Sequence, residues 1–85
     1  MIQDAFTIRQ KVKQFVLQET FVEKNIIRDD SLIFKEGYFD SMGFVRLIEF
    51  VEKEFNFKTV DADLIEENFN SINAIADFIG RKTKD

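Results

Sequence analysis

The chain has 85 residues, of which 45% are hydrophobic, and a formal net charge of −4 at pH 7, so residues 1–85 have the size and apolar content of a single small domain. It contains no Cys and no His, and therefore lacks the usual thiolate nucleophiles, neutral-pH bases and metal ligands; we expect neither a metal site nor an enzyme that works alone. There is no signal-peptide pattern, and no apolar run approaches the length of about 18 residues that a membrane span needs. The acidic balance argues against nucleic acid as a partner. We therefore expect a cytoplasmic, monomeric binding module.

The first expected element is an amphipathic helix from Asp4 to Thr20. Its apolar positions recur at helical spacing, and Asp4 is a suitable N-cap because its side chain can accept a hydrogen bond from a free backbone N–H. The positions expected to face the core are Ala5, Ile8, Val12, Phe15, Val16 and Glu19.

Residues 25–40 are expected to form a long loop, because the helical periodicity breaks down there. Asp29, Asp30 and Ser31 are turn formers, and Gly37 can adopt a positive φ. The loop is nevertheless rich in apolar side chains, which predict that it is anchored in the core: Ile26, Ile27, Leu32, Ile33, Phe34 and Phe39.

The clearest helical pattern runs from Ser41 to Phe55, with Asp40 as the expected N-cap. Its outward positions are charged: Arg46, Glu49, Glu52 and Lys53. Its apolar stripe consists of Phe44, Val45, Ile48, Val51 and Phe55, extended by Leu47 and Phe50.

Two further helical segments complete the chain. A short helical turn is expected over Asp61–Ile65, and a last helix is expected to begin at an Asn70 or Ser71 cap and to end at Gly80, followed by the basic residues Arg81, Lys82 and Lys84. Its apolar stripe is Ile72, Ile75, Ala76 and Ile79. No segment alternates as a strand, so the predicted fold is an all-α bundle of three main helices plus one short helix, with a Phe-rich core.

The acidic side chains are concentrated in the middle of the chain. Residues 1–28 carry five basic and three acidic side chains, residues 29–70 carry four and eleven, and residues 71–85 carry three and two. The middle segment therefore has a net charge of −7 between slightly basic ends. Such a distribution is typical of a solvated face and also of a docking surface for a basic partner.

The acidic residues do not form a recognisable calcium or acid–base site. Neither Asp29-Asp30-Ser31 nor Asp61-Ala62-Asp63 is followed by Gly at the position that an EF-hand loop requires. Glu49, Glu52 and the Glu66-Glu67 pair are interpreted as exposed helix carboxylates, because nothing in the sequence predicts a cleft that would perturb them.

The remaining candidate is Asp40-Ser41-Met42, at the start of the second helix. An ordinary helix start explains these residues completely, since Asp caps, Ser is common in the first turn and Met fills gaps. The functional interpretation is that Ser41 presents its hydroxyl beside unpaired backbone N–H groups, which with the helix dipole favour a phosphate ester there. A tethered cofactor would then supply the thiol that the chain lacks.

At these residues the sequence resembles the acyl carrier protein family. The matching run extends from Gly37 to Phe50 and contains the Asp-Ser-Met core that such proteins carry at the start of their second helix. The similarity extends over essentially the whole chain in length, acidic middle, long first loop, short third helix and apolar fourth helix.

The resemblance implies roles for particular residues. Ser41 would receive 4′-phosphopantetheine from coenzyme A through a phosphopantetheinyl transferase, and the thiol of the arm would hold an acyl group as a thioester for loading and transferring enzymes. Asp40 would orient the helix start and the modifying enzyme, while Met42, Arg46, Glu49 and Lys53 would be read by partner enzymes. The lining of an acyl pocket would be Phe44, Ile48, Ile65, Phe69 and Ile75, for each of which an ordinary core position is an equal alternative.

The sequence departs from fatty-acid-synthesis carriers at three positions. Such carriers have an acidic residue two positions after the Ser, where this chain has Gly43, and Arg46 and Lys53 interrupt the acidity of the second helix. The pattern is similar to specialised stand-alone carriers, including D-alanyl carriers. The expected function is an acyl carrier of fatty-acid, lipid or polyketide-type biosynthesis; the alternatives are an aminoacyl carrier and a cofactor-free interaction module that uses the acidic second helix.

Overall fold

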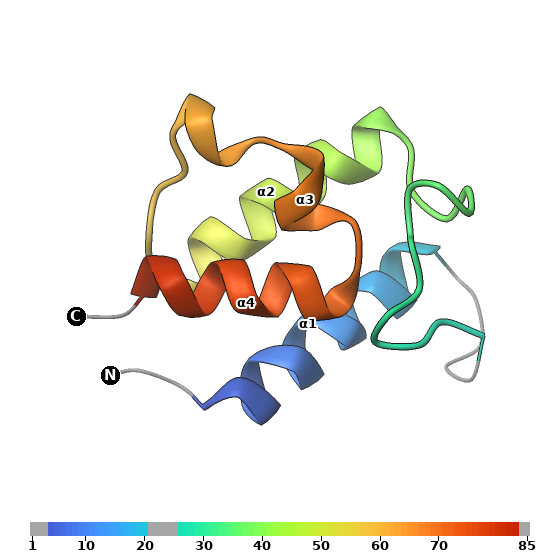
Figure 1. Ribbon diagram of the computed structural model, residues 1–85, viewed down its shortest axis with the longest axis horizontal. Coiled ribbons are helices and arrows are strands. Elements are labelled where there is room, and N and C mark those ends of the chain that lie inside the picture. The colour runs from blue at the N-terminus through green and yellow to red at the C-terminus, as the bar shows by residue number, and fades with distance from the viewer. Residues whose placement is uncertain (1–3, 21–25, 84–85) are drawn as a thin grey trace.

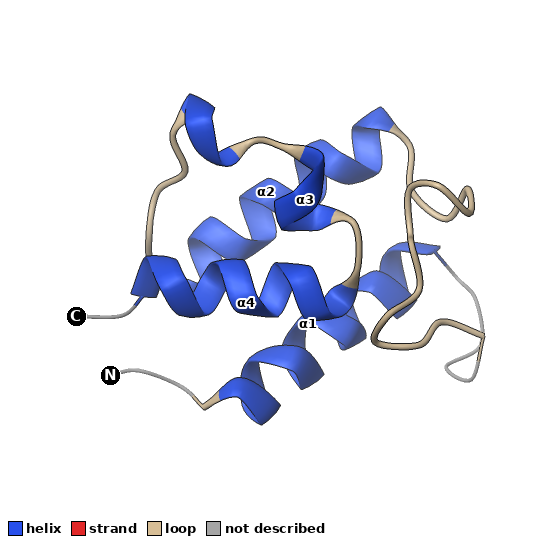
Figure 2. Ribbon diagram, in the orientation of Figure 1, coloured by secondary structure: helices blue, strands red, loops and turns tan. Residues whose placement is uncertain are grey.

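The computed structural model describes residues 4–20 and 26–83, which form helices and connecting turns without a strand (Figures 1 and 2). The main helices are α1 (Ala5–Thr20), α2 (Ser41–Phe55) and α4 (Ile72–Thr83). The expected turn over 61–65 is a 3₁₀ turn at Asp61–Asp63, and a separate short helix, α3 (Glu66–Phe69), follows it. The predicted all-α class is confirmed; the one short helix was predicted at 61–65, and the short α-helix of the structure, α3, begins just after these residues.

The last helix, α4, is the centre of the packing. It lies against α1 along much of its length and also packs on α3, while α2 makes smaller contacts with both α1 and α4. In Figure 1 the start of α1 and the end of α4 lie on the same side, and the long loop before α2 lies at the opposite end. The start of α2 and α3 both lie on the side of α4 opposite α1.

The cap of α1 forms as predicted. The Thr7 N–H donates to Asp4 Oδ1 at 2.7 Å, and this bond is the main reason that the pKa of Asp4 lies below its ordinary value. The buried face of α1 is narrower than predicted: Ile8, Val12 and Val16 are buried, whereas Ala5 is exposed and Phe15 is half-buried. Ala5 is exposed because the first turn of α1 projects beyond the other helices (Figure 1).

The long loop is anchored in the core, as its apolar content predicted, but only some of its apolar residues are buried. Ile27, Ile33 and Phe39 are buried, while Ile26 and Leu32 are 50% and 37% exposed. Gly37 has a φ of +87°, the positive value that Gly adopts without strain.

Backbone hydrogen bonds join the long loop to the segment around the start of α4. The Ile33 N–H donates to the Asn70 carbonyl at 3.0 Å, and the Asn73 N–H donates to the Asp29 carbonyl at 2.9 Å. The loop is therefore fixed by buried side chains and by its backbone at the same time.

The ends of α4 settle one prediction and correct another. Ser71 is the N-cap, because its Oγ accepts from the Ala74 N–H at 3.1 Å. Gly80 does not end the helix, which continues for another turn to Thr83, whose hydroxyl donates to the Ile79 carbonyl at 2.8 Å. The added turn carries Arg81 and Lys82, and the predicted basic residue Lys84 lies outside the described residues.

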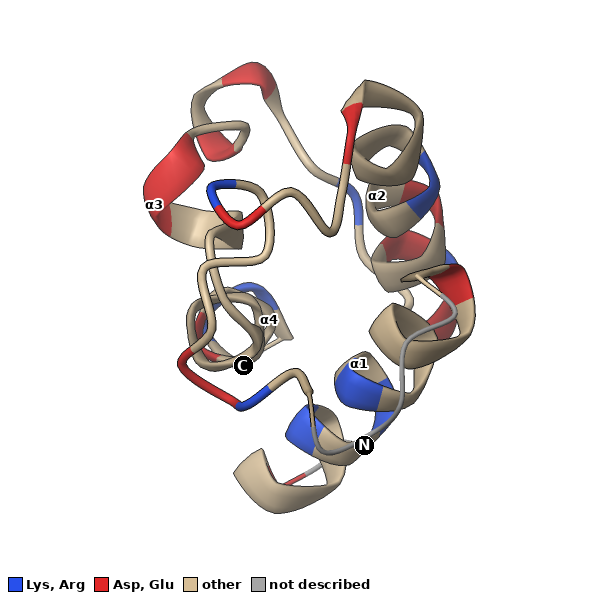
Figure 3. Cartoon of the chain, turned by 90° about the vertical axis from the view of Figure 1, so that its right-hand side faces the viewer, with Lys and Arg blue, Asp and Glu red and all other residues tan. Residues whose placement is uncertain are grey.

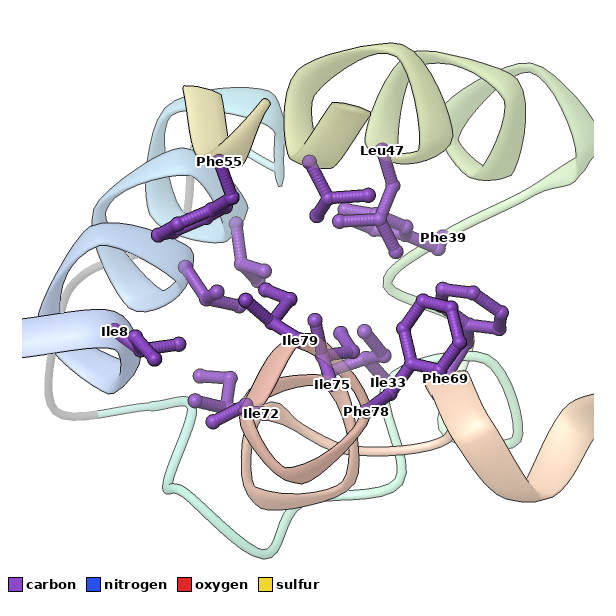
Figure 4. Close-up of a cluster of buried hydrophobic side chains, with 14 of the residues drawn as sticks. Ile8, Ile33, Phe39, Leu47, Phe55, Phe69, Ile72, Ile75, Phe78 and Ile79 are labelled. Carbon is purple, nitrogen blue, oxygen red and sulfur yellow. The ribbon is translucent and has the colours of Figure 1, made fainter. Parts of the chain in front are cut away.

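The core is aliphatic along α1 and α4 and aromatic toward α3. Figure 4 shows Phe39 and Phe69 at the end of the cluster far from Ile8, with Phe78 beside Phe69. Four Phe side chains are fully or nearly buried, as the predicted Phe-rich core requires, and others cover the cluster as half-buried rings. Three of the four lie at this end, whereas Phe55 lies on the side of Ile8 (Figure 4). The buried side chains are Ile8, Val12, Val16, Ile27, Ile33, Phe39, Leu47, Val51, Phe55, Phe69, Ile72, Ile75, Ala76, Phe78 and Ile79.

Candidate functional site

The site is organised around the first turn of α2. Asp40 is extended, with φ −111° and ψ −170°, and its Oδ1 accepts from the Gly43 N–H at 2.9 Å while its carbonyl accepts from the Phe44 N–H, also at 2.9 Å. Asp40 is thus the N-cap that the sequence predicted. The side-chain cap uses the Gly43 N–H. The N–H groups of Ser41 and Met42 also lie in the first turn, where backbone N–H groups have no hydrogen-bond partner within the helix.

Ser41 differs from the other two serines of the chain in both exposure and bonding. Ser31 Oγ accepts from the Arg28 N–H at 2.9 Å, and Ser71 is a buried cap. Ser41 is exposed, and its hydroxyl makes no hydrogen bond to another described residue. It is therefore the serine whose hydroxyl is available for chemistry.

Gly43 explains one of the departures noted in the sequence. A Cβ at this position would lie at an ordinary contact distance of 3.5 Å from Asp40 Oδ1, but only 3.3 Å from the Phe39 ring, so a side chain would require the ring to shift slightly. Phe39 is 6% exposed and packs against this first turn. The absence of a side chain at Gly43 thus leaves room for the close approach of the buried Phe39 ring to the cap.

A groove of about 860 Å³ begins beside Ser41 and lies between α2, the long loop and residues 60–69, which contain the 3₁₀ turn and α3 and are called the α3 segment below. Aromatic rings dominate its walls, aliphatic side chains complete them, and Lys35 and Glu66 provide charges. The lining residues are Phe34, Lys35, Phe39, Asp40, Ser41, Phe44, Val45, Leu64, Ile65, Glu66 and Phe69. Ser41 thus stands at an apolar groove as well as at a helix N-terminus.

The residues expected to line an acyl pocket divide into two groups. Phe44, Ile65 and Phe69 line the groove. Ile75 does not line it, because this residue is fully buried among the aliphatic side chains of α4, and Ile48 is half-buried against the core instead. A helical stripe shows which residues face inward, but not which of them face a groove.

Several lining residues were not assigned to the site from the sequence. Phe34 and Phe39 were expected only as loop anchors, and Val45 was placed in the apolar stripe of α2, whereas it is 49% exposed at the groove. Leu64 and Glu66 belong to the α3 segment, which is too short for a periodic pattern. The sequence showed only that some of these residues are apolar and lie in irregular segments. That does not reveal which residues they contact in the folded chain.

The α3 segment, which forms the outer wall of the groove, is fixed to the last turn of α4. Asp63 Oδ2 accepts from the Val60 N–H at 2.9 Å and pairs with Lys82 Nζ at 2.9 Å. Asn68 donates to the Asp63 carbonyl at 2.8 Å, and its Oδ1 accepts from Arg81 at 2.6 Å. The Lys82 ammonium is the main reason, followed by the Val60 N–H, that the pKa of Asp63 lies below its ordinary value.

The residues expected to meet partner enzymes are on the surface. Met42 is 58% exposed, and Arg46, Glu49 and Lys53 are exposed on α2. Figure 3 shows basic and acidic segments alternating along α2, with acidic segments around α3 on the other side of the molecule.

Arg46 also has a structural contact that the sequence did not reveal. Its Nε bonds to Glu19 on α1, so this side chain joins the two helices. The helical spacing placed Glu19 among the core-facing positions of α1, and in the structure its carboxylate pairs with Arg46 of α2.

Comparison with known proteins bears directly on this arrangement. The chain is 32% identical over 72 residues to an acyl carrier protein of Buchnera aphidicola subsp. Baizongia pistaciae, covering 85% of this chain and 90% of that protein. The chain belongs to the acyl carrier protein family. No family model matches the chain. The resemblance first noted at Asp40-Ser41-Met42 is thereby confirmed at the level of the family, and a carrier role follows in general terms.

The family membership is accompanied by two findings from residues 4–20 and 26–83. In these ranges no cluster of three or more acidic side chains could hold a metal ion. No helix there is both long enough and apolar enough to cross a membrane.

Proposed function

We propose that Ser41 of this acyl carrier protein carries a 4′-phosphopantetheine arm whose thiol holds an acyl group as a thioester. A phosphopantetheinyl transferase would supply the arm from coenzyme A, and separate enzymes of fatty-acid, lipid or polyketide-type biosynthesis would load and unload the acyl group. The chain itself is the tethered substrate of these enzymes and not a catalyst.

The observation that carries this proposal is the position of Ser41. Its hydroxyl is exposed, it belongs to the first turn of α2, and it lines the apolar groove. A phosphodiester there would lie close to first-turn amides and the positive end of the helix dipole, which favour an anion. The residues present therefore fit the phosphate end of the arm, and the groove fits an apolar group at its other end.

The test is modification of the cofactor-free chain by a broad-specificity phosphopantetheinyl transferase with coenzyme A and magnesium. We expect the intact mass to increase by one phosphopantetheine, and we expect no increase for Ser41→Ala under the same conditions. Ser31→Ala is the matched control and should be modified as the original chain is. Failure of modification with several such transferases would favour a cofactor-free interaction module instead.

A further inference from the structure

The groove beside Ser41 ends on phenylalanine rings and not on an opening into the core. The ring of Phe44 packs edge-to-face against Phe34, with centroids 5.6 Å apart, and against Phe69, with centroids 5.4 Å apart at an interplanar angle of 88°. Phe34 continues the row to Phe39, at 5.4 Å and 89°. Rings in such contact leave no passage between them for a methylene chain.

The aliphatic core lies beyond this row of rings. Leu47 and Ile75 are fully buried and do not line the groove. Phe69 also contacts Phe78 of α4, with centroids 5.0 Å apart, which continues the aromatic layer onto the last helix. Figure 4 shows Phe39 and Phe69 together at this end of the core.

The opposite side of the groove is open to solvent. Val45 on one rim and Leu64 and Ile65 on the other are each between 41% and 49% exposed. A group that lies in the groove is therefore covered by the ring row and flanked by α2 and the α3 segment, while the side away from the rings faces solvent. Any part of a chain that extends past the rim remains in water.

We infer that the groove takes a short or medium-length acyl group, which lies across the aromatic row, and that Phe44 sets the depth of the groove. Phe44 has this role because it contacts the ring on either side of it, so that its removal opens the floor toward Leu47 and Ile75. A long alkyl chain gains nothing further, because its outer methylenes find no tunnel and extend past the exposed rims into water. This inference rests on the proposed arm at Ser41.

The test measures how the melting temperature depends on the length of the attached acyl group. Each methylene removed from water stabilises the folded chain, so the melting temperature reports how much of the group is buried. The transferase would attach arms from butyryl, hexanoyl, octanoyl, dodecanoyl and hexadecanoyl coenzyme A to the chain. We expect the melting temperature to rise as far as octanoyl and to show no further rise for dodecanoyl and hexadecanoyl.

A second route makes the result independent of the transferase. The chain has no Cys, so Ser41→Cys introduces a single thiol. This thiol can be alkylated with iodoacetamide reagents in which a pantetheine-length spacer ends in the same acyl groups. If the transferase fails but the alkylated series still levels off, the proposed function is wrong while the inference about the groove stands.

Variants at Phe44 identify the floor. In Phe44→Ala we expect the rise to continue to dodecanoyl, and Phe44→Leu, which keeps more of the apolar volume, should give the same change to a smaller extent. Phe50→Leu is the matched control on the same helix, because Phe50 stacks on Phe15 outside the groove. Phe50→Leu should lower the melting temperature of every form and leave the chain length at which the rise stops unchanged.

Two results would overturn the inference. One is a melting temperature of the original chain that still rises from octanoyl to hexadecanoyl, which would show that the chain passes the ring row. The other is no rise for any acyl group, which would show that the groove does not hold the acyl group at all.

Discussion

Asp40 and Ser41 are neighbours in the sequence with separate tasks in the structure. The Asp40 carboxylate is directed at the Gly43 N–H, 2.9 Å away, and so fixes where α2 begins. Ser41 follows as the first residue of the helix, with an exposed hydroxyl that is free of hydrogen bonds to the described residues. Position and availability of the Ser41 hydroxyl therefore depend on the residue before it.

Two replacements of Asp40 should show whether its contribution to the free energy of unfolding comes from the N-cap hydrogen bond or from its negative charge. We expect Asp40→Ala to lower the free energy of unfolding by about 0.5–2 kcal/mol, because the N-cap hydrogen bond is lost. Asp40→Asn should retain nearly all of the stability, since an amide oxygen caps as well as a carboxylate. Urea unfolding followed by circular dichroism gives both values, and equal stability of Asp40→Ala and the original chain would contradict the role of the cap.

At the scale of elements, the long loop behaves as a part of the core and not as a linker. Two adjacent isoleucines show this most clearly, because Ile27 is fully buried whereas Ile26 is 50% exposed. Backbone bonds from Ile33 to Asn70 and from Asn73 to Asp29 join the loop to the start of α4. The loop thereby holds Phe34 and Phe39 at the groove.

The two isoleucines provide a matched pair of variants. We expect Ile27→Ala to cost about 2–5 kcal/mol of unfolding free energy, the usual cost of truncating a buried side chain. Ile26→Ala should change it by no more than about 0.5 kcal/mol, as exposed substitutions do. Similar losses for the two variants in chemical unfolding would show that the loop is not anchored as described.

The outer wall of the groove should respond to acid through Asp63. Its pKa is lowered in the folded chain, mainly by Lys82, so the carboxylate stabilises the fold above the ordinary aspartate value of 3.8, and this contribution is lost as the pH falls through the lower folded-state pKa. Asp63→Asn should therefore melt at a lower temperature than the original chain at pH 7, and this difference should shrink as the pH drops below 3.8.

The control for Asp63 is Asp77→Asn, which removes an exposed carboxylate from α4. Its melting temperature should follow that of the original chain over the whole pH range. A difference at Asp63 that stays constant down to full protonation would contradict the assigned ion pair.

Much of the fold was predictable from the sequence, because the main helices bury a continuous stripe that repeats every three to four residues. The four-residue helix α3 has no such repeat. Gly80 was taken as a helix end, but it does not adopt the positive φ of a helix-ending glycine, and α4 continues to Thr83. The position of Ser41 at the start of α2, with Asp40 as the N-cap, was predictable from the residue types alone. The groove was only partly so, because Phe34, Leu64 and Val45 meet there through tertiary packing between distant segments.

On the scale of the whole molecule, the acidity of the middle segment is divided between two kinds of carboxylate. Some are used within the fold: Glu52 accepts from the Thr59 N–H at 2.9 Å and its hydroxyl at 2.7 Å, and Glu54 pairs with Lys11 at 3.2 Å. Others, such as Glu49, are exposed and make no ion pair with a described residue. Under the proposed function, we expect the second group and the exposed apolar Met42 to form the surface that a partner meets beside Ser41.

Variants of this surface should affect partners and not the fold. We expect Met42→Ala and Glu49→Lys each to reduce the kcat/KM of a phosphopantetheinyl transferase by about two- to fivefold, the effect of losing one contact or exposed ion pair, with unchanged helix content. The loss in Glu49→Lys should diminish at high salt, because exposed charges are screened. Asp77→Lys makes the same charge change on α4 and should leave the rate unaltered; loss of helix content in either test variant would assign these residues to the core.

The central claim is that Ser41 is the attachment point of the arm, and peptide-level mass spectrometry of the transferase-treated chain tests it most directly. The three serines of the chain, Ser31, Ser41 and Ser71, lie in different peptides after digestion at the basic residues between them. We expect the phosphopantetheine mass on the peptide that contains Ser41 and on neither of the others. A modified chain whose added mass lies on Ser31 or Ser71, or one that is still modified after Ser41→Ala, would contradict the account.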